Sequence, residues 1–186
     1  MDKAMPHKIF ESYNLKSLPL QNRIVMAPMT RCLDGDDDTP TALIETYYAQ
    51  RSSAGLIITE GTPVSPGARG YLWTPGIYSD DQVAGWSAVS RAVHDAGGRI
   101  FMQIWHVGRI SHHSLLPGGE MPEGPTDEHS QDATCFAYDA DGNPGNVITS
   151  PPRALTAAAI ARVREDFVRA AVNARKAGMD GVEIHG

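Results

Sequence analysis

The sequence lacks the features of a secreted, membrane-embedded or nucleic-acid-binding protein. Its two cysteines, Cys32 and Cys135, lie far apart and outside any metal-ligand spacing, so we expect two reduced thiols and a cytoplasmic protein. No apolar run approaches the roughly 18 residues of a membrane span, and no apolar segment follows the first residues as in a secretory signal. The net charge is −6 without a basic stripe, which argues against a nucleic-acid partner.

Four short apolar runs recur along the 186 residues. Each run has the length of a strand and is rich in branched or aromatic side chains, as buried parallel strands are. The runs cover residues 24–27, 56–59, 100–105 and 181–185.

Helical segments with start and stop signals separate these runs. Pro40 suits a first helical position after Thr39, and this helix is expected to end near Ala54 and Gly55. A second helix should start at a capping box made by Ser79 and Gln82. A third should start near Thr156, end at Ala177 and Gly178, and bury one face, formed by Ile160, Val163, Phe167, Ala170 and Ala174.

The alternation of strands and helices predicts a parallel sheet covered by helices. Both a doubly wound sheet and a (βα)₈ barrel fit this order, but no G-x-G-x-x-G motif follows the opening strand. Barrel enzymes build their sites from the carboxyl ends of several strands. The strand ends here hold Thr30, Gly61, Gln103, Trp105 and His185, which favours a (βα)₈ TIM barrel, of which this chain supplies the first four strands.

Two segments lie outside the repeat. Residues 1–22 are expected to form an N-terminal hairpin that plugs the barrel floor. Residues 107–153 are rich in Gly and Pro and follow the third strand, so we expect a long active-site loop. No internal boundary is visible, and residues 1–186 are interpreted as one domain, the N-terminal half of a barrel.

Several motifs in a common order resemble one family. The segments 22–31, 76–79, 98–109, 152–155 and 181–186 are similar to those of the Old Yellow Enzyme family, the FMN-dependent ene-reductases. The resemblance covers essentially the whole chain. It implies a TIM-barrel flavoprotein that uses FMN, with NADH or NADPH as the reductant.

The resemblance also implies cofactor contacts for individual residues. Pro28, Met29 and Thr30 match a strand end that runs along the flavin, where the Thr hydroxyl donates to flavin O4 and tunes the flavin potential. Gly61 matches a small residue whose backbone lies near the flavin. Gln103 matches an amide that binds the pyrimidine edge, and an amide supplies both the donor and the acceptor that this edge needs.

Two further residues are implied to bind the substrate. Trp105 matches an aromatic residue that lines the substrate pocket. His185 matches the first of two side chains that bind the substrate's carbonyl or nitro oxygen, where a donor stabilises the charge that develops during hydride addition. His185 and Thr30 are therefore the catalytic candidates.

Each residue also has a structural interpretation when it is taken alone. Thr30 then fits a turn at a strand end, Trp105 fits a core position, and His185 fits a hydrogen-bonded structural histidine. Gln103 is harder to explain in this way, because a buried amide inside an apolar strand needs partners. For His106 and Arg109 we favour a structural role in anchoring the long loop, and Arg23 is placed near the flavin.

The resemblance implies an NAD(P)H-dependent reductase of activated alkenes such as α,β-unsaturated carbonyls, or of nitro compounds or nitrate esters. The family's second oxygen-binding residue, its proton-donating Tyr and its phosphate loops correspond to positions beyond residue 186. We therefore expect the isolated chain to be inactive and to associate with a complementary C-terminal half-barrel or with itself. The alternatives are a non-catalytic half-barrel and a barrel enzyme with another cofactor.

A calcium-like spacing is present but incomplete. Asp34, Asp36, Asp38 and Glu45 stand at EF-hand ligand positions, yet Thr39 occupies the place that needs Gly. No metal site is therefore expected.

Overall fold

The computed structural model describes residues 7–35 and 37–186. The first six residues of the expected N-terminal extension and Asp36 of the acidic run lie outside this part of the chain.

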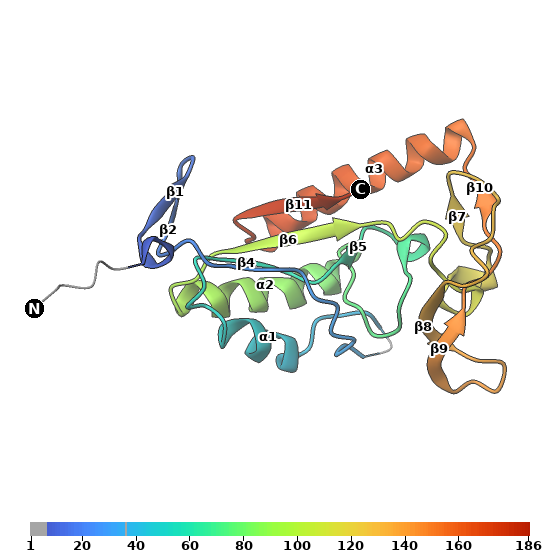
Figure 1. The fold of residues 1–186 in the computed structure, drawn as a ribbon, viewed down its shortest axis with the longest axis horizontal. Helices are drawn as coiled ribbons and strands as arrows, with labels where there is room; N and C mark the ends of the chain where they lie inside the picture. The colour runs from blue at the N-terminus through green and yellow to red at the C-terminus, as the bar shows by residue number, and fades with distance from the viewer. Residues whose placement is uncertain (1–6, 36) are drawn as a thin grey trace, which may run out of the picture.

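A parallel sheet forms the centre of the molecule (Figure 1). Its strands follow the order β11-β6-β4-β3, and the short strand β5 pairs with the end of β6. These are the four strands that the sequence predicts, although β3 is shorter than expected, since Pro28 has no N–H to extend a ladder. The bounds are β3 Val25–Met26, β4 Leu56–Ile58, β5 Thr62–Pro63, β6 Ile100–Trp105 and β11 Gly181–His185.

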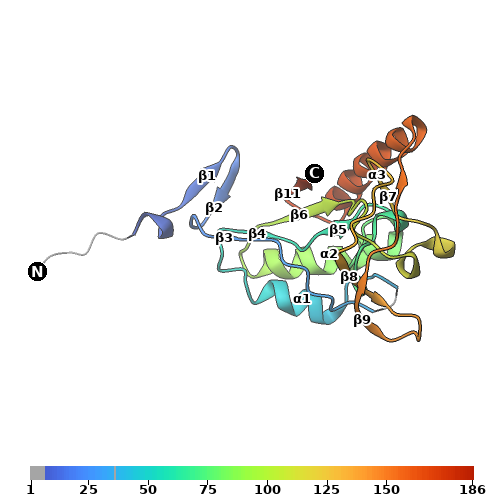
Figure 2. The ribbon, with the colours of Figure 1, turned by 45° about the vertical axis from the view of Figure 1, so that its right-hand side comes forward.

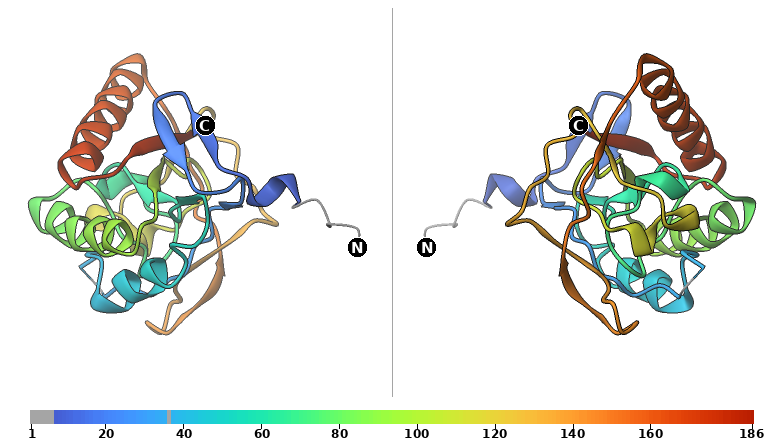
Figure 3. Two further views of the ribbon diagram at one scale, coloured as in Figure 1. Left: turned by 90° about the vertical axis from the view of Figure 1, so that its left-hand side faces the viewer. Right: turned by 90° about the vertical axis from the view of Figure 1, so that its right-hand side faces the viewer.

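Three helices cover one side of this sheet (Figure 3). They are α1 (Ala42–Ala49), α2 (Asp80–Asp95) and α3 (Ala157–Lys176). Between helices and sheet lies one apolar core, which includes Ile44, Tyr48, Ile57, Trp86, Val89, Ile100, Met102, Ile104, Ala170 and Ala174. The helical face expected for the third helix is only partly correct, because Ile160 is 49% exposed near the start of α3.

The predicted caps of α2 and α3 are present. Ser79 Oγ accepts from Gln82 N at 3.2 Å, and Gln82 Oε1 accepts from Ser79 N at 3.1 Å, which completes the capping box. At the start of α3, Thr156 Oγ1 accepts from Ala159 N at 3.2 Å.

Helix α1 differs from its prediction at both ends. It begins after Thr41, and it ends at Ala49 instead of continuing to Ala54. Two side chains that precede β3 bind the carbonyl groups of residues 52 and 53. In a longer helix these carbonyl groups would be directed along the helix axis. Gln21 Nε2 donates to Ser52 O at 2.7 Å, and Asn22 Nδ2 donates to Ser53 O at 2.9 Å. These bonds favour tight turns after α1.

The expected N-terminal hairpin is present at the amino-terminal end of the sheet (Figures 1 and 2). A short 3₁₀ helix, η1 (Lys8–Phe10), leads into β1 (Tyr13–Leu15), which pairs antiparallel with β2 (Leu18–Leu20). Leu20 is buried, whereas Phe10 is 61% exposed.

The long segment after β6 has its own structure. Strands β8 (Thr134–Tyr138) and β9 (Pro144–Ile148) form an antiparallel hairpin, and β7 (Glu123–Gly124) pairs parallel with β10 (Arg153–Ala154). All of it lies beyond the carboxyl end of β6 (Figure 1). The short helices of the loops are η2 (Pro66–Ala68), η3 (His113–Leu115) and η4 (Pro117–Gly119).

A second, smaller apolar cluster joins this hairpin to the loop after β5. Leu72 and Leu115 pack with Cys135 and Ala137 of β8. Both cysteines are free thiols. Within residues 7–35 and 37–186, no helix has the length and apolar character needed to cross a membrane.

Candidate active site

The carboxyl ends of the parallel strands gather the predicted residues at one edge of the sheet. Trp105 and His185 are the last residues of β6 and β11 and lie side by side in register. Thr30 and Gly61 follow β3 and β4 by a few residues. Parallel pairing alone therefore places these residues along a common edge.

Alternate residues of β6 face opposite sides of the sheet. Met102 and Ile104 point into the core under the helices and are 0% and 1% exposed. Phe101, Gln103 and Trp105 therefore point to the other side, which would be the inside of a closed barrel. We call this side the inner face.

Three cross-strand pairs line the inner face between β6 and β11. In register they are Phe101 with Gly181, Gln103 with Glu183, and Trp105 with His185. The first pair needs a glycine, because a Cβ atom at position 181 would lie 2.6 Å from the Phe101 ring.

Gln103 is held by two polar partners. Its side chain is buried, and its Nε2 donates to Glu183 Oε1 at 2.7 Å. Its backbone N–H donates to Thr59 Oγ1 of the neighbouring strand segment at 3.0 Å. Glu183 is not among the residues predicted from the sequence. The available signal was its position two residues before His185, which places it on the same face of a strand.

Trp105 belongs to an aromatic group at the strand ends. Its ring stacks on Tyr71, with 5.9 Å between centroids, and lies 5.7 Å from the His185 ring. These three residues, with His106, Val107, Ile110 and Gly186, line a cavity of about 320 Å³. The buried Trp105 Nε1 has no hydrogen-bond partner in the described part of the chain. Tyr71 was also missed, because it lies in a loop that no strand pattern marks.

Gly61 lies directly against this aromatic group. A Cβ atom at position 61 would come within 2.6 Å of the Trp105 ring. The space required by Trp105 therefore already explains a glycine at this position, in addition to any approach to a flavin.

The segment after β3 is exposed on one side and anchored on the other. Met29 is 46% exposed, Thr30 is exposed and Pro28 is half-buried. The next residue is tied to the sheet, since Arg31 N donates to Glu60 Oε2 at 2.9 Å. No hydrogen bond or ring contact joins residues 28–30 to Gln103, Trp105 or His185 in the part of the chain that the structure describes.

Buried carboxyl groups lie behind this segment. Glu60 is fully buried, and its Oε1 accepts from the Tyr48 hydroxyl at 3.4 Å. Burial raises the pKa of Glu60 to about 7, although hydrogen bonds from Arg31 N and the Tyr48 hydroxyl oppose this shift. Burial, reinforced by the negative charge of Glu60, raises the pKa of Asp34 to about 8. Glu60 is not among the residues predicted from the sequence, because its burial depends on the packing of Tyr48 and the segment after β3.

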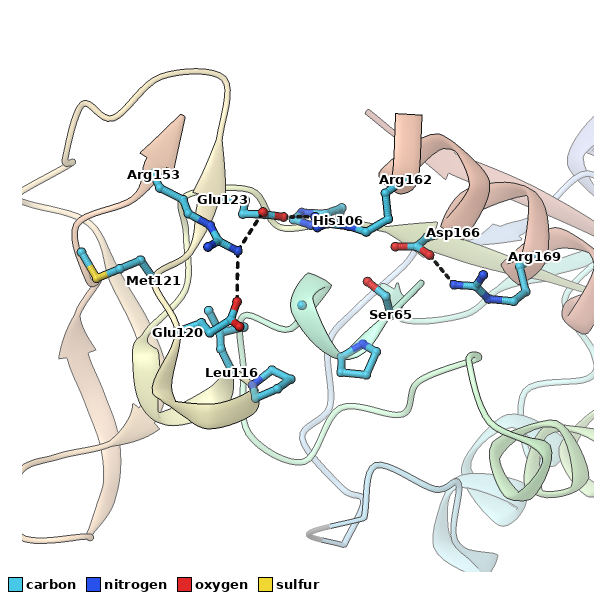
Figure 4. A pocket seen from close by; sticks show the side chains of 13 residues that line it. Ser65, His106, Leu116, Glu120, Met121, Glu123, Arg153, Arg162, Asp166 and Arg169 are labelled. Atoms are coloured by element: carbon cyan, nitrogen blue, oxygen red, sulfur yellow. Dashed lines mark hydrogen bonds and ion pairs between the residues drawn. The ribbon is translucent and has the colours of Figure 1, made fainter. Parts of the chain in front are cut away.

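A second cavity, of about 330 Å³, lies between the long loop and α3 (Figure 4). Its charged side chains are engaged with one another. Glu123 is bound by Arg162 and by Arg153, whose Nη2 lies 3.0 Å from Glu123 Oε1, while Arg169 binds Asp166. We interpret this network as the attachment of the loop to α3.

His106, which precedes the long loop, and Arg109, within it, each bind a backbone group of the loop. His106 Nδ1 accepts from Gly108 N at 3.0 Å, and burial lowers the pKa of the imidazole. Arg109 Nη1 donates to Glu128 O at 3.1 Å. Both contacts are local to the loop, and the anchoring role of His106 and Arg109 stays a prediction. Among the described residues, no group of three or more His, Cys, Asp or Glu side chains is arranged to hold a metal ion.

The model of one family, described as the NADH:flavin oxidoreductase / NADH oxidase family, matches residues 8–186. The chain belongs to this family. The resemblance to the Old Yellow Enzyme family is thereby confirmed, and so are FMN and a nicotinamide as the cofactors that characterise the NADH:flavin oxidoreductases.

Relatives of known structure support the same assignment. Morphinone reductase in complex with tetrahydroNAD is 48% identical, with a TM-score of 0.92 over 97% of this chain and 49% of that chain. The Old Yellow Enzyme homologue from Zymomonas mobilis is 40% identical, with a TM-score of 0.88 over 96% of this chain and 48% of that chain. These neighbours confirm the partial TIM barrel.

Among curated proteins, 12-oxophytodienoate reductase 1 of Oryza sativa subsp. japonica is 43% identical over 94% of this chain and 43% of its own length. Chanoclavine-I aldehyde reductase of Penicillium roqueforti is 42% identical over 96% of this chain and 45% of its own length. The chain thus spans slightly less than half the length of these curated relatives.

The inner face fits one side of an FMN site. The Gln103 amide offers the donor and the acceptor that suit a pyrimidine edge, and Glu183 binds it in a defined place. The exposed Thr30 provides a hydroxyl, whereas Gly61 is buried against the Trp105 ring. The residues present are compatible with the flavin of the NADH:flavin oxidoreductases.

Proposed function

We propose that this chain supplies the first half of the active site of an FMN-dependent ene-reductase that oxidises NADH or NADPH. Its substrates would be activated alkenes such as α,β-unsaturated carbonyls, with nitro compounds or nitrate esters as further candidates. The observation that supports this most is the pair of inner-face contacts, Gln103 with Glu183 and Trp105 with His185, in a member of the NADH:flavin oxidoreductase family. The names of the relatives also support it, because they describe reductases of 12-oxophytodienoate, morphinone and an aldehyde.

In this proposal the residues of the chain divide the work. Gln103 holds the pyrimidine edge of FMN, and Pro28, Met29 and Thr30 lie along the ring, with the Thr30 hydroxyl donating to O4. The backbone of Gly61 would lie near the flavin, next to the Trp105 ring that packs against this glycine. The chemistry that FMN supplies when bound is hydride transfer.

Substrate would bind at the aromatic group. Trp105 lines the pocket, and a ring nitrogen of His185 donates to the carbonyl or nitro oxygen, where it stabilises the negative charge that develops. Both residues line the 320 Å³ cavity at the strand ends, which supports a common role. A cytoplasmic location agrees with the free thiols of Cys32 and Cys135 and remains a prediction.

A visible absorption spectrum and an intact mass of the purified protein test the cofactor. We expect flavin absorption that bleaches with NADH or NADPH without oxygen and recovers when an enone is added, once the barrel is complete. Gln103→Leu should weaken FMN binding by about tenfold, the effect of about 1.4 kcal/mol, because its hydrogen bonds are lost. Gln131→Leu, at an exposed loop position, is the matched control. Equal FMN binding by both variants would contradict the proposal.

A second candidate is a half-barrel that acts by associating with a complementary chain or with itself. It is favoured by the outermost strands of the described sheet, β3 and β11. On β11, Ile184 is 67% exposed, and Val168 on the adjacent α3 is 66% exposed. Both line an open cavity of about 500 Å³, and apolar surface of this kind favours association.

Light scattering can test this association. We expect a defined complex when the chain is mixed with the C-terminal half of a relative's barrel, or a self-associated species without it. Val168→Lys should weaken either complex, since a charge would replace an apolar contact. A chain that stays monomeric at high concentration and binds no complementary half would contradict this candidate.

A further inference from the structure

The partner of Gln103 on the inner face is a carboxylate. Glu183 stands directly beside Gln103 in the parallel pairing of β11 with β6. The Gln103 Nε2 to Glu183 Oε1 distance is 2.7 Å, the length of a charge-assisted hydrogen bond. Glu183 is half-buried and is bracketed on its own strand by Gly181 and His185, which point to the same face. The carboxylate therefore lies on the inner face between the Phe101 ring and the Trp105–His185 pair, away from the helices.

A carboxylate restricts an amide in a way that a neutral partner does not. An ionised Glu only accepts hydrogen bonds, whereas a Gln side chain donates at its nitrogen and accepts at its oxygen. The amide of Gln103 must therefore turn Nε2 towards Glu183. A flipped amide would place its Oε1 against the Glu183 carboxylate, and two acceptors would repel each other. Glu183 thus selects one of the two amide orientations and directs the Gln103 carbonyl oxygen away from itself.

We propose that Glu183 is a positioning residue, which fixes the orientation of the Gln103 amide so that its carbonyl oxygen accepts from a flavin ring N–H. This inference rests on the proposed function, since it assigns Gln103 to FMN. Its chemical basis is independent of catalysis. The role needs an acceptor at position 183 and is weakened by any partner that tolerates both amide orientations.

The first experiment observes the amide without any flavin. In ¹⁵N-labelled protein, the two side-chain amide protons of Gln103 should resonate further apart than those of the exposed Gln131, because only one of them faces the carboxylate. Glu183→Leu should reduce the separation to that of Gln131, and Glu183→Gln should reduce it by less. Glu45→Gln is the matched control, at a half-buried glutamate on α1. Unchanged Gln103 signals in both Glu183 variants would overturn the inference.

The second experiment measures FMN binding through flavin fluorescence. It uses the complex of this chain with the C-terminal half of a relative's barrel, as described above. We expect Glu183→Leu to raise the dissociation constant by about tenfold, which corresponds to about 1.4 kcal/mol. Glu183→Gln should raise it less, because an amide still accepts in one of its orientations. The Glu45→Gln control should bind FMN as the unsubstituted protein does. FMN binding unchanged by Glu183→Leu would overturn the positioning role.

The two experiments separate this inference from the proposed function. If the unsubstituted protein with a complete barrel binds no FMN, the proposed function fails, and the flavin part of this inference fails with it. The amide signals then still decide whether Glu183 orients Gln103. If FMN binds and the amide signals change only in the Glu183 variants, both the proposed function and the orienting pair are supported.

Discussion

The two sides of the central sheet differ in composition and burial. On the outer side, Ile57, Ile100 and Met102 are all 0% exposed beneath the helices. On the inner face, β6 and β11 present Gln103, Glu183 and His185, which are polar and in part accessible. Successive residues of one strand thus serve two purposes: outward side chains stabilise the fold, and inward side chains are available for binding.

The carboxyl ends of the strands also differ from the apolar layer beneath the helices. There the chain buries carboxyl groups such as Glu60 and Asp34, whose raised pKa values show that their charged forms are disfavoured. These two carboxyl groups therefore make stability fall as the pH rises from about 4 to about 8, while the apolar layer beneath the helices stabilises the fold at any pH. A site built next to such groups is typical of proteins that give up some stability for function.

The largest expected effect on stability compares two neighbouring residues of β6, one on each side of the sheet. Met102→Ala should lower the free energy of unfolding by about 2–5 kcal/mol, because it leaves a cavity in the core. Gln103→Ala, one residue further, should cost less than about 1.5 kcal/mol, since it mainly removes one hydrogen bond. Urea unfolding of both variants measures the difference. Equal losses would mean that the two sides contribute alike to stability.

The next effect concerns pH. The folded-state pKa values of Glu60 and Asp34, about 7 and about 8, lie above the ordinary values of 4.5 and 3.8. The folded state therefore binds more protons between these limits, and stability falls as pH rises from about 4 to about 8. Asp34→Asn should reduce this fall by roughly 3 kcal/mol. Chemical denaturation at pH 5 and pH 8 measures it.

Asp132→Asn, in an exposed part of the long loop, provides the control for this substitution. It should leave the pH dependence as in the unsubstituted protein. An identical pH dependence in Asp34→Asn and Asp132→Asn would show that Asp34 is ionised without penalty, contrary to the burial described above.

A smaller effect is expected at Glu123. Its buried carboxylate is paired with two arginines and should therefore stabilise the folded protein, unlike the buried carboxyl groups of Glu60 and Asp34. Glu123→Gln removes the charge that Arg153 and Arg162 share and should cost about 1–3 kcal/mol. Glu128→Gln should cost almost nothing, since that carboxylate is 81% exposed and 3.9 Å from Arg109. Thermal unfolding of the two variants gives the comparison. A Glu123 variant as stable as the Glu128 variant would show that the network does not hold the loop to α3.

Much of the fold could be predicted from local patterns. The four strands are apolar runs of the right length, and the caps at Ser79 and Thr156 depend on residues close in sequence. The end of α1 could not be predicted, because Gln21 and Asn22 bind the carbonyl groups that follow it from about 30 positions away. A contact of that kind leaves no periodic signal in either segment.

In the candidate site, too, local features could be predicted from the sequence, whereas contacts between distant segments could not. Gln103 stands out in the sequence because it is an amide inside an apolar run. Glu183 becomes meaningful only through the register of β11 with β6, which joins residues 80 positions apart. Tyr71 is brought to Trp105 by a loop, and Glu60 reaches the segment after β3 through a hydrogen bond to Arg31. These three contacts depend on tertiary structure.

The two free thiols can report local opening of the structure through the rate at which they are chemically labelled. Burial raises the pKa of Cys32, with a further contribution from the charge of Glu60, and burial raises the pKa of Cys135 to about 11. A thiol-specific dye reacts with the thiolate, so both residues should be labelled slowly while their surroundings stay closed. The labelling rate at Cys32 then reports how often the segment beside Thr30 opens, and the rate at Cys135 reports the same for the β8–β9 hairpin.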